Sequence, residues 1–415
     1  MRRSPGRPQT LKHLAFFEVL AEAAEDSREA KLATAGLLSL RMIDHWVLAG
    51  PAIVEPESVS VRSVRLAIMA LPSNEPVREA LLSVVNTMQM LRHVVLVPVL
   101  PRVFAYAQLL ERHHGAMKLA ADAYETVVRL ADLEFDADLI MDSYLNLAIC
   151  QRKTGSLESA VESSTALIGL AKRRKDRPRT LRARISLAHV AMMRGDLAGA
   201  DAEFLAIATE AQKHNMTREY AMSTHNRAVV ASRKQQPGRA VVLAYAALKN
   251  TSDPVDRDRV LGDLAAFLIP LGRYDAALDA LRVLEVTASS EEPRVFARIN
   301  MVVIAALTNS REVFEAASAA LDGADIAVEA RVGLLVETAR CRLLFNEPAA
   351  AADALTAAER ICVQHDLTAL MREVDRLRTG SGAVTHTISE IPVADENPVH
   401  EVELDLRQMA ASMAG

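Results

Sequence analysis

Three polar residues recur at a fixed interval in the middle of the chain. Asn146, Ser186 and Asn226 follow one another at steps of 40 residues. An Asn side chain carries amide donors and a carbonyl acceptor, so it can bond to both polar groups of a peptide backbone. If the interval reflects a repeating structure, these side chains form a polar ladder that could hold an extended peptide without reading its side chains. The chemistry that the spacing predicts is ligand binding.

The sequence holds no pattern that predicts catalysis. It lacks a phosphate-binding Gly-Lys-Ser/Thr loop, a Gly-x-Gly-x-x-Gly motif, His-Glu-x-x-His and Cys-x-x-Cys. The adjacent His113 and His114 would diverge by about 100° on a helix, so they are poorly placed to share a metal ion. We therefore expect no enzyme activity, no catalytic residue, no metal and no cofactor.

Composition narrows the class of protein further. Of the 415 residues, 50% are hydrophobic and only 4% aromatic, which suits closely packed helices better than a sheet or a disordered chain. The net charge of −5 makes nucleic acid an unlikely partner. The sequence contains no apolar run near the roughly 20 residues needed to cross a bilayer, so no membrane partner is expected.

The spacing of the cysteines indicates the cellular compartment in which the protein is expected. Cys150, Cys341 and Cys362 form no closely spaced pair, and each falls within an expected helix. This pattern is typical of reduced, buried thiols rather than of a disulfide framework or a metal site. We expect a cytoplasmic protein.

The stretch from Arg184 to Ala211 shows the element that would position the ladder. Apolar residues spaced three or four apart form two helical stripes on either side of Gly195-Asp196. Gly accepts the left-handed conformation that ends a helix, and Asp can cap the start of the next one. The stretch predicts a helix, a tight turn and a second helix. One such hairpin cannot bury its own apolar face, so further copies are expected.

Copies of this hairpin are present along most of the chain. The turn residue recurs at steps of 40 residues and then at shorter or degraded steps, at Gly115, Gly155, Gly195, Gln235, Gly272 and Asn346. This recurrence predicts an all-α stack of about eight hairpins, because a repeated unit that cannot stand alone must bury its apolar face against its neighbours.

At these turns the chain resembles the tetratricopeptide repeat family, whose second helix follows a Gly-Asp-Tyr-x-x-Ala pattern. Gly272-Arg273-Tyr274-Asp275-Ala276-Ala277 and Gly195-Asp196-Leu197-Ala198-Gly199-Ala200 carry the resemblance best. The repeat of about 37 to 40 residues is longer than the usual 34 and is similar to a long-repeat bacterial type. The resemblance implies a right-handed α-solenoid, a superhelix of helical hairpins.

The resemblance also implies a ligand site. In this family the first helix of each hairpin lines a concave groove in which peptides bind. Carried over copy by copy, the groove positions fall on ten residues of this chain, namely Arg102, Tyr106, Arg112, Asn146, Arg152, Arg182, Ser186, His189, His225 and Asn226. The arginines would favour a ligand with acidic residues or a free carboxylate. In the alternative interpretation the Asn residues bond within the stack and the arginines are only a solvated face.

The chain is expected to divide into four segments. Residues 1–10 would be a disordered basic arm, in which Gly6-Arg7-Pro8 matches the core of a DNA-binding AT-hook, although a plain basic tail is favoured. Residues 11–97 would form divergent N-terminal helical hairpins. Residues 98–379 would form the solenoid with a C-terminal capping helix, and residues 380–415 an acidic flexible tail.

The tail carries a short amphipathic helix in this interpretation. Val402, Leu406, Met409 and Met413 share one helical stripe within residues 399–413, next to acidic residues. We hypothesise that the tail docks into the basic groove, of its own molecule or of a neighbour, as a self-inhibiting plug. The alternative is that the tail helix recruits a separate protein.

The function predicted from the sequence is a non-catalytic scaffold that binds a protein or peptide in the groove of the solenoid. Two alternatives stay open. One is a peptide-responsive regulatory or sensor protein of bacterial signalling. The other is a structural subunit that assembles through exposed solenoid ends.

Overall fold

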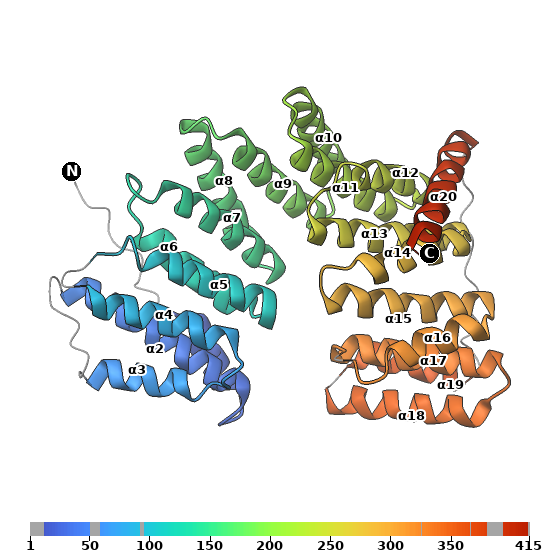
Figure 1. Ribbon diagram of the computed structural model, residues 1–415, viewed down its shortest axis with the longest axis horizontal. Coiled ribbons are helices and arrows are strands. Elements are labelled where there is room, and N and C mark those ends of the chain that lie inside the picture. The colour runs from blue at the N-terminus through green and yellow to red at the C-terminus, as the bar shows by residue number, and fades with distance from the viewer. Residues whose placement is uncertain are drawn as a thin grey trace. The chain divides into compact units, whose positions relative to one another are not determined.

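The computed structural model describes residues 12–49, 59–91, 95–324, 326–365, 367–379 and 393–413. Within these ranges the regular elements are the helices α1 to α20 and one 3-10 turn, and there is no strand (Figure 1). The protein is an all-α helical solenoid, as the periodicity predicted. The chain forms two compact units, Met1–Gly195 and Asp196–Gly415, which are described separately. The predicted basic arm at residues 1–10 lies outside the described residues.

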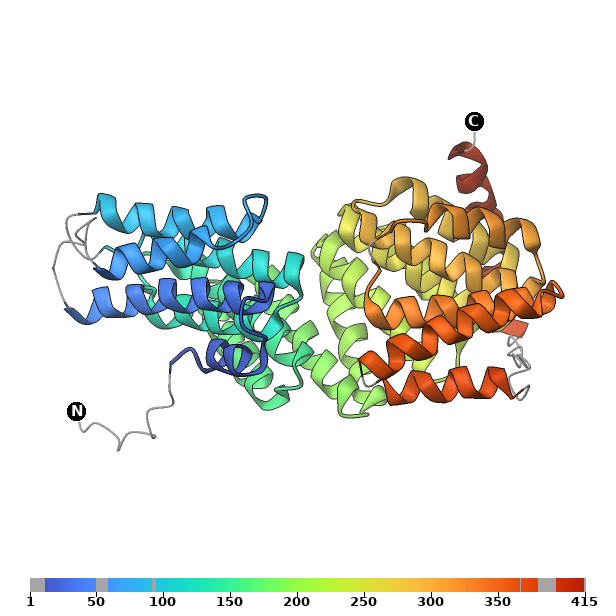
Figure 2. The same ribbon diagram turned by 90° about the horizontal axis from the view of Figure 1, so that it is seen from below.

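The first unit contains nine helices in its described part, and Figure 2 shows its early helices, in blue, running alongside one another. They are α1 (Leu14–Glu22), α2 (Arg28–Ala49), α3 (Val59–Met69), α4 (Pro76–Met90), α5 (Leu100–His114), α6 (Met117–Leu130), α7 (Ala137–Lys153), α8 (Leu157–Arg173) and α9 (Arg177–Met193). The pairs α5/α6 and α7/α8 are repeat hairpins. One apolar core joins α5, α6 and α7 to the N-terminal helices, with Phe16, Trp46 and Tyr124 among its buried side chains.

The second unit continues the repeats. Its helices are α10 (Leu197–Lys213), α11 (Thr217–Arg233), α12 (Pro237–Leu248), α13 (Pro254–Leu268), α14 (Tyr274–Thr287), α15 (Glu291–Thr308), α16 (Arg311–Ala320), α17 (Val328–Leu344), α18 (Pro348–Gln364), α19 (Thr368–Arg378) and α20 (Val393–Met413). The hairpins are α11/α12, α13/α14, α15/α16 and α17/α18, and α19 packs on α17 and α18. The boundary between the units falls inside the predicted solenoid, at the turn after Gly195.

Each repeat turns through one residue in the left-handed backbone region. The values of φ are +59° at Gly115, +81° at Gly155, +89° at Gly195, +69° at Gly272 and +62° at Asn346. Gln235 occupies the same position with φ of +59°, although a side chain is disfavoured there. The structure also has a left-handed turn at Asn309, where φ is +52°, in the α15/α16 hairpin, whose sequence matches the repeat poorly. The predicted turn positions are confirmed.

Alanine fills the crossing between the two helices of most repeats. Seven residues before the turn, Ala148, Ala228 and Ala339 are each 0% exposed. Five residues after the turn stand Ala120, Ala160, Ala240, Ala277 and Ala351, all at most 1% exposed. A larger side chain at these points would separate the backbones, because packed interiors have almost no free volume. The Asn309 hairpin has Val302 and Phe314 at these positions, both buried, which explains its poor match.

A polar cluster fastens α1 and α2 to α6. His13 Nδ1 lies 2.5 Å from Asp122 Oδ1, and Arg129 Nη2 donates to Asp44 Oδ1 over 2.7 Å. Burial alone would raise the pKa of the Asp44 carboxyl, but hydrogen bonds from Arg129 and Lys12 outweigh it, so the pKa lies below its usual value. These bonds connect residues 85 to 109 positions apart, which periodicity cannot relate.

The C-terminal tail differs from its prediction. Residues 393–413 form the helix α20, longer than the expected 399–413, and it packs on α12 and α14 of its own unit (Figure 1). Those are second helices of their hairpins, whereas the hypothesised groove is made of first helices. Docking of the tail within its own chain is therefore confirmed, but the hypothesis that it fills the groove of its own molecule is wrong. The physical reason is that Val399, Val402 and Leu406 join the apolar core of the second unit, which a polar groove cannot match.

Gly36 of α2 provides a test of the N-terminal packing. A Cβ atom at this position would lie 2.1 Å from the Tyr106 hydroxyl oxygen and 2.5 Å from Phe16 Cε1. We expect Gly36→Ala to lower the free energy of unfolding of the first unit by about 1–3 kcal/mol, because the overpacked side chains must shift. Urea unfolding and hydrogen exchange in α2 measure the effect.

Gly169→Ala in α8 of the same unit is the matched control. Its new Cβ would meet only Arg173 Nη1, at 3.8 Å. This substitution should leave stability unchanged or raise it by up to ~1 kcal/mol, since Ala favours helix over Gly. Equal effects of the two substitutions would contradict the packing described for Gly36.

Candidate functional site

The first helices of the first unit lie against one another. α7 contacts both α5 and α9, so one face of the unit carries side chains from three consecutive first helices. Eight of the ten predicted groove residues belong to these helices. The other two, His225 and Asn226, are on α11 of the second unit and are treated separately.

Arg102 stands at one end of this face, on α5. Its Nε donates to Ser83 Oγ over 3.0 Å, and its Nη1 bonds to the carbonyl of Pro98. It borders a shallow depression of about 400 Å³. The other lining residues repeat at helical spacing along α4 and are Glu79, Leu82, Ser83, Asn86, Thr87 and Met90. Two of the Arg102 donors thus hold the guanidinium in place at the edge of an open surface.

Tyr106 and Ser186 are buried and do not line a surface. Tyr106 is 0% exposed and sits over Gly36 inside the core, and its burial raises the pKa of the phenol above its ordinary value. Ser186 is 4% exposed and accepts a hydrogen bond from Ser164 Oγ over 3.0 Å, between α9 and α8. The family-derived groove position is wrong for these two side chains, because each faces a neighbouring helix rather than solvent.

Asn146 is partly buried on α7 and belongs to a polar chain. Its Nδ2 donates to the Tyr124 hydroxyl over 3.3 Å, and that hydroxyl donates to Glu111 Oε2 over 3.1 Å. Burial, with the charge of Glu111, raises the pKa of Tyr124, so the phenol keeps its proton. The Asn146 amide is oriented by this chain. An amide has two donor hydrogens and an acceptor oxygen, so this one bond leaves it further capacity.

The remaining predicted groove residues of the first unit are partly buried or exposed. Arg112 is exposed on α5, and Arg152, Arg182 and His189 are partly buried on α7 and α9. His189 Nδ1 lies 2.9 Å from the carbonyl of Ile185 on its own helix, which fixes the ring. These four residues lie on the same three first helices as Asn146.

His225 and Asn226 are held within the second unit. His225 is 6% exposed, and its Nε2 lies 2.8 Å from Asp263 Oδ2 of the next first helix, α13. Asn226 donates from Nδ2 to the carbonyl of Met222 over 2.9 Å. Buried His225 therefore links two repeats instead of lining a groove. For Asn226 the bond to its own helix agrees with the alternative in which the Asn residues bond within the stack.

Sequence reasoning missed a charge network that connects α7 to α9. Arg179 donates from Nε to Asp142 over 2.8 Å, and from Nη1 to Asp138 over 2.9 Å and to Asp176 over 2.7 Å. Burial by itself would raise the pKa of Asp176, but the backbone and side-chain hydrogen bonds from Arg179 outweigh it and lower the pKa. The pKa of the Arg179 guanidinium is raised, chiefly by Asp142.

A signal for such pairs exists in the sequence. Arg179 and Asp142 are 37 residues apart, and His225 and Asp263 are 38 apart, which is about one repeat. Polar partners about one repeat apart on consecutive first helices meet because those helices lie side by side. A search at the repeat interval could have found both pairs.

The three thiols are buried, and the described residues contain no cluster suited to a metal ion. Cys150, Cys341 and Cys362 are free and buried. Burial raises the pKa of the Cys150 and Cys341 thiols to about 12. Among the described residues no group of three or more His, Cys, Asp or Glu side chains could hold a metal ion. Nor is any described helix both long and apolar enough to cross a membrane.

Comparison with known proteins gives the following. No protein-family model matches the chain, and no curated protein matches it. A solved Rap conjugation gene regulator of the plasmid pLS20, in complex with the Phr* peptide, is 12% identical, with a TM-score of 0.48 over 79% of this chain and 96% of that one. A Rap protein complexed with competence and sporulation factor is 12% identical, with a TM-score of 0.46 over 81% and 99%.

BtubC from P. vanneervenii is 15% identical, with a TM-score of 0.39 over 60% of this chain and 92% of that one. At these scores the likeness identifies no ligand, activity or partner for this chain. The left-handed turns and the alanine crossings of the structure itself define the class: an all-α helical-repeat fold of the tetratricopeptide type.

The raised thiol pKa values lead to a testable expectation. Thiolate is the reactive form, and buried thiols with a pKa near 12 are almost wholly protonated at pH 8. We expect the native protein to react very slowly with Ellman's reagent at pH 8, and all three thiols to react at once in guanidinium chloride. Rapid labelling of one thiol in the native protein would show that its helix opens.

Proposed function

We propose that the first-helix face of the first unit, formed by α5, α7 and α9, binds an extended peptide segment of another protein. The observation that carries this proposal is Asn146, a partly exposed amide held by Tyr124 on α7. α7 contacts both α5, which carries Arg102 and Arg112, and α9, which carries His189. An oriented amide can clasp a peptide backbone, and fixed guanidinium groups can receive carboxylates.

The ligand chemistry that fits is an acidic peptide or a free C-terminal carboxylate. Arg102 is anchored by Ser83 and Pro98, so less freedom is lost when it binds an anion. The same first helices also carry Asp138 and Asp142, which share the single guanidinium of Arg179 with Asp176, so Arg179 offsets only part of their charge. The chain acts in this proposal as a scaffold in the cytoplasm, without catalysis.

The substitution Asn146→Ala tests whether the Asn146 amide binds the backbone of the peptide. Three short peptides of equal length, one acidic, one neutral and one basic, are titrated against the full chain by fluorescence anisotropy. We expect the acidic peptide to bind best, and Asn146→Ala to weaken its binding about threefold to tenfold, the usual effect of losing one or two hydrogen bonds. If Asn146→Ala binds the acidic peptide as tightly as the wild type does, Asn146 is not part of the site.

Arg112→Glu tests the charge preference. This exposed residue has room for the substitution, and reversal of its charge should weaken acidic-peptide binding several-fold at low salt and less at high salt. Lys172→Glu, an equal charge change at an exposed position of the second helix α8, is the control and should have little effect. Equal weakening by both variants would indicate attraction by net charge alone, without a site.

A further inference from the structure

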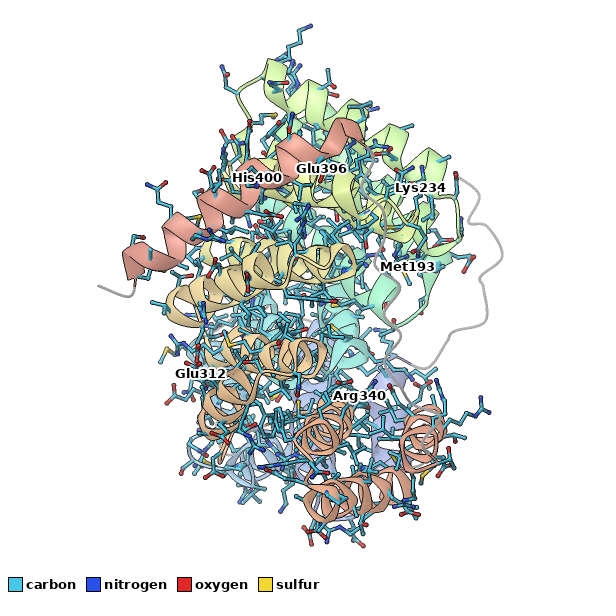
Figure 3. All side chains as sticks on the ribbon, turned by 90° about the vertical axis from the view of Figure 1, so that its right-hand side faces the viewer. Met193, Lys234, Glu312, Arg340, Glu396 and His400 are labelled. Atoms are coloured by element: carbon cyan, nitrogen blue, oxygen red, sulfur yellow. The ribbon has the colours of Figure 1, made fainter. Side chains whose placement is uncertain are left out.

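The C-terminal helix α20 is bound to the second unit in the manner of a ligand. It lies across α12 and α14, and Figure 3 shows it, marked by Glu396 and His400, resting on the outside of the second unit's helices. α19 already covers α17 and α18, so α20 is not needed to close the end of the repeat stack. Thirteen residues, 380–392, separate it from the last residue described before it, Thr379.

The helix α20 buries a single stripe of regularly spaced apolar side chains. Val399, Val402 and Leu406 are at most 3% exposed and belong to the core of the second unit. Their spacing of three and four residues places them on one helical stripe, which Met409 and Met413 extend as partly buried side chains. Leu404, off this stripe, is 50% exposed. The surface on α12 and α14 thus accepts one apolar helical stripe.

Charged contacts fix the register of α20 along this surface. Arg273, the residue before α14, lies 3.1 Å from Glu403 through Nε and 3.5 Å from Glu396 through Nη2. At the end of α12, the Tyr245 hydroxyl donates to Asp405, and Lys249 Nζ lies 3.6 Å from the same carboxylate. Burial and the bond to Asp405 raise the pKa of Tyr245. Cations and one phenol on the receptor side therefore meet carboxylates on the helix side.

α20 itself is not an optimal helix. Pro398 lies inside it, and a proline removes one backbone donor and disfavours helix in the residue before it. The acidic residues and the apolar stripe are thus held in helical form largely by the surface beneath them. Such a segment resembles a binding motif that folds against its receptor more than a structural repeat.

We propose that the face of α12 and α14 is a docking site for an acidic amphipathic helix of another protein, and that α20 occupies this site in its own chain. The fitting helix has aliphatic residues at the positions of Val399, Val402 and Leu406, with carboxylates at those of Glu396, Glu403 and Asp405. Charge complementarity with Arg273 and Lys249 selects it. This site is on the second unit and is independent of the peptide face proposed for the first.

Attachment to the chain gives α20 the advantage over a free competitor. A tethered ligand acts at a local concentration on the order of millimolar, so a partner helix must bind more tightly, or α20 must first be weakened, before exchange occurs. Only a partner helix that binds tightly enough to displace α20 can therefore occupy the site.

The test uses the full chain and a labelled peptide of residues 393–413. We expect weak binding of this peptide to the wild type by fluorescence anisotropy. Val402→Asp/Leu406→Asp in the chain should release its own α20 and tighten peptide binding at least tenfold. Asp405→Lys, which removes only the contacts with Tyr245 and Lys249, should tighten it by a smaller factor and gives a milder variant if the double one folds poorly.

Arg273→Glu, added to either released variant, should weaken peptide binding at least tenfold. A peptide with Glu396→Arg and Glu403→Arg should restore it. The control is Arg282→Glu on the same helix α14, because Arg282 pairs with Asp279 of its own helix at 3.3 Å. This variant should bind the peptide as the released parent does.

Several results would overturn the proposal. One is that neither released variant binds the peptide although its circular dichroism matches that of the wild type. Another is that Arg273→Glu and Arg282→Glu have the same effect. A third is that the wild type sediments as a dimer that the α20 substitutions abolish, which would assign the site to a second copy of this chain instead of a different protein.

Discussion

The repeats depend on one backbone constraint, the single left-handed residue between the two helices of each hairpin. Gly115, Gly155, Gly195 and Gly272 meet it without steric cost. Gln235 and Asn346 adopt the same conformation with a side chain, at a cost of roughly 1–2 kcal/mol for a residue other than glycine. The turn is held there because the helices on either side are fixed by their packing. A tight turn brings the helices close, and this closeness requires small residues where they cross.

The alanines are required by that closeness, and they limit the faces on which a first helix can place polar side chains. Ala148 and Ala228 on first helices, and Ala120 and Ala240 on second helices, are all 0% exposed. Positions with so little room cannot hold polar or charged groups, so the polar residues of a first helix are confined to its other faces. The polar pairs that form there, such as Arg179 with Asp142 and His225 with Asp263, connect repeats rather than stabilise single hairpins.

The two candidate binding surfaces use different faces of the repeat. The face proposed for a peptide is built from first helices, and its oriented amide and its arginines lie on adjacent helices. The surface under α20 is built from second helices, and its main contribution is apolar, with ion pairs at the two ends. An extended peptide matches the first because it offers backbone polar groups. An amphipathic helix matches the second because its own backbone is already satisfied and only its side chains need partners.

The sequence by itself determined the fold class, the turn positions and the crossing alanines, because these depend on local spacing and on the conformational freedom of glycine. It also indicated which helices come first in each hairpin, and placed Asn146 on one of them. Only the tertiary structure decided that Tyr106, Ser186 and His225 are buried against neighbouring helices. Periodicity predicts on which side of a helix a residue lies, but not which neighbouring element covers that side. Only the tertiary structure showed that α20 lies on α12 and α14. That docking joins segments more than a hundred residues apart through complementary apolar area and charge, which no local pattern records.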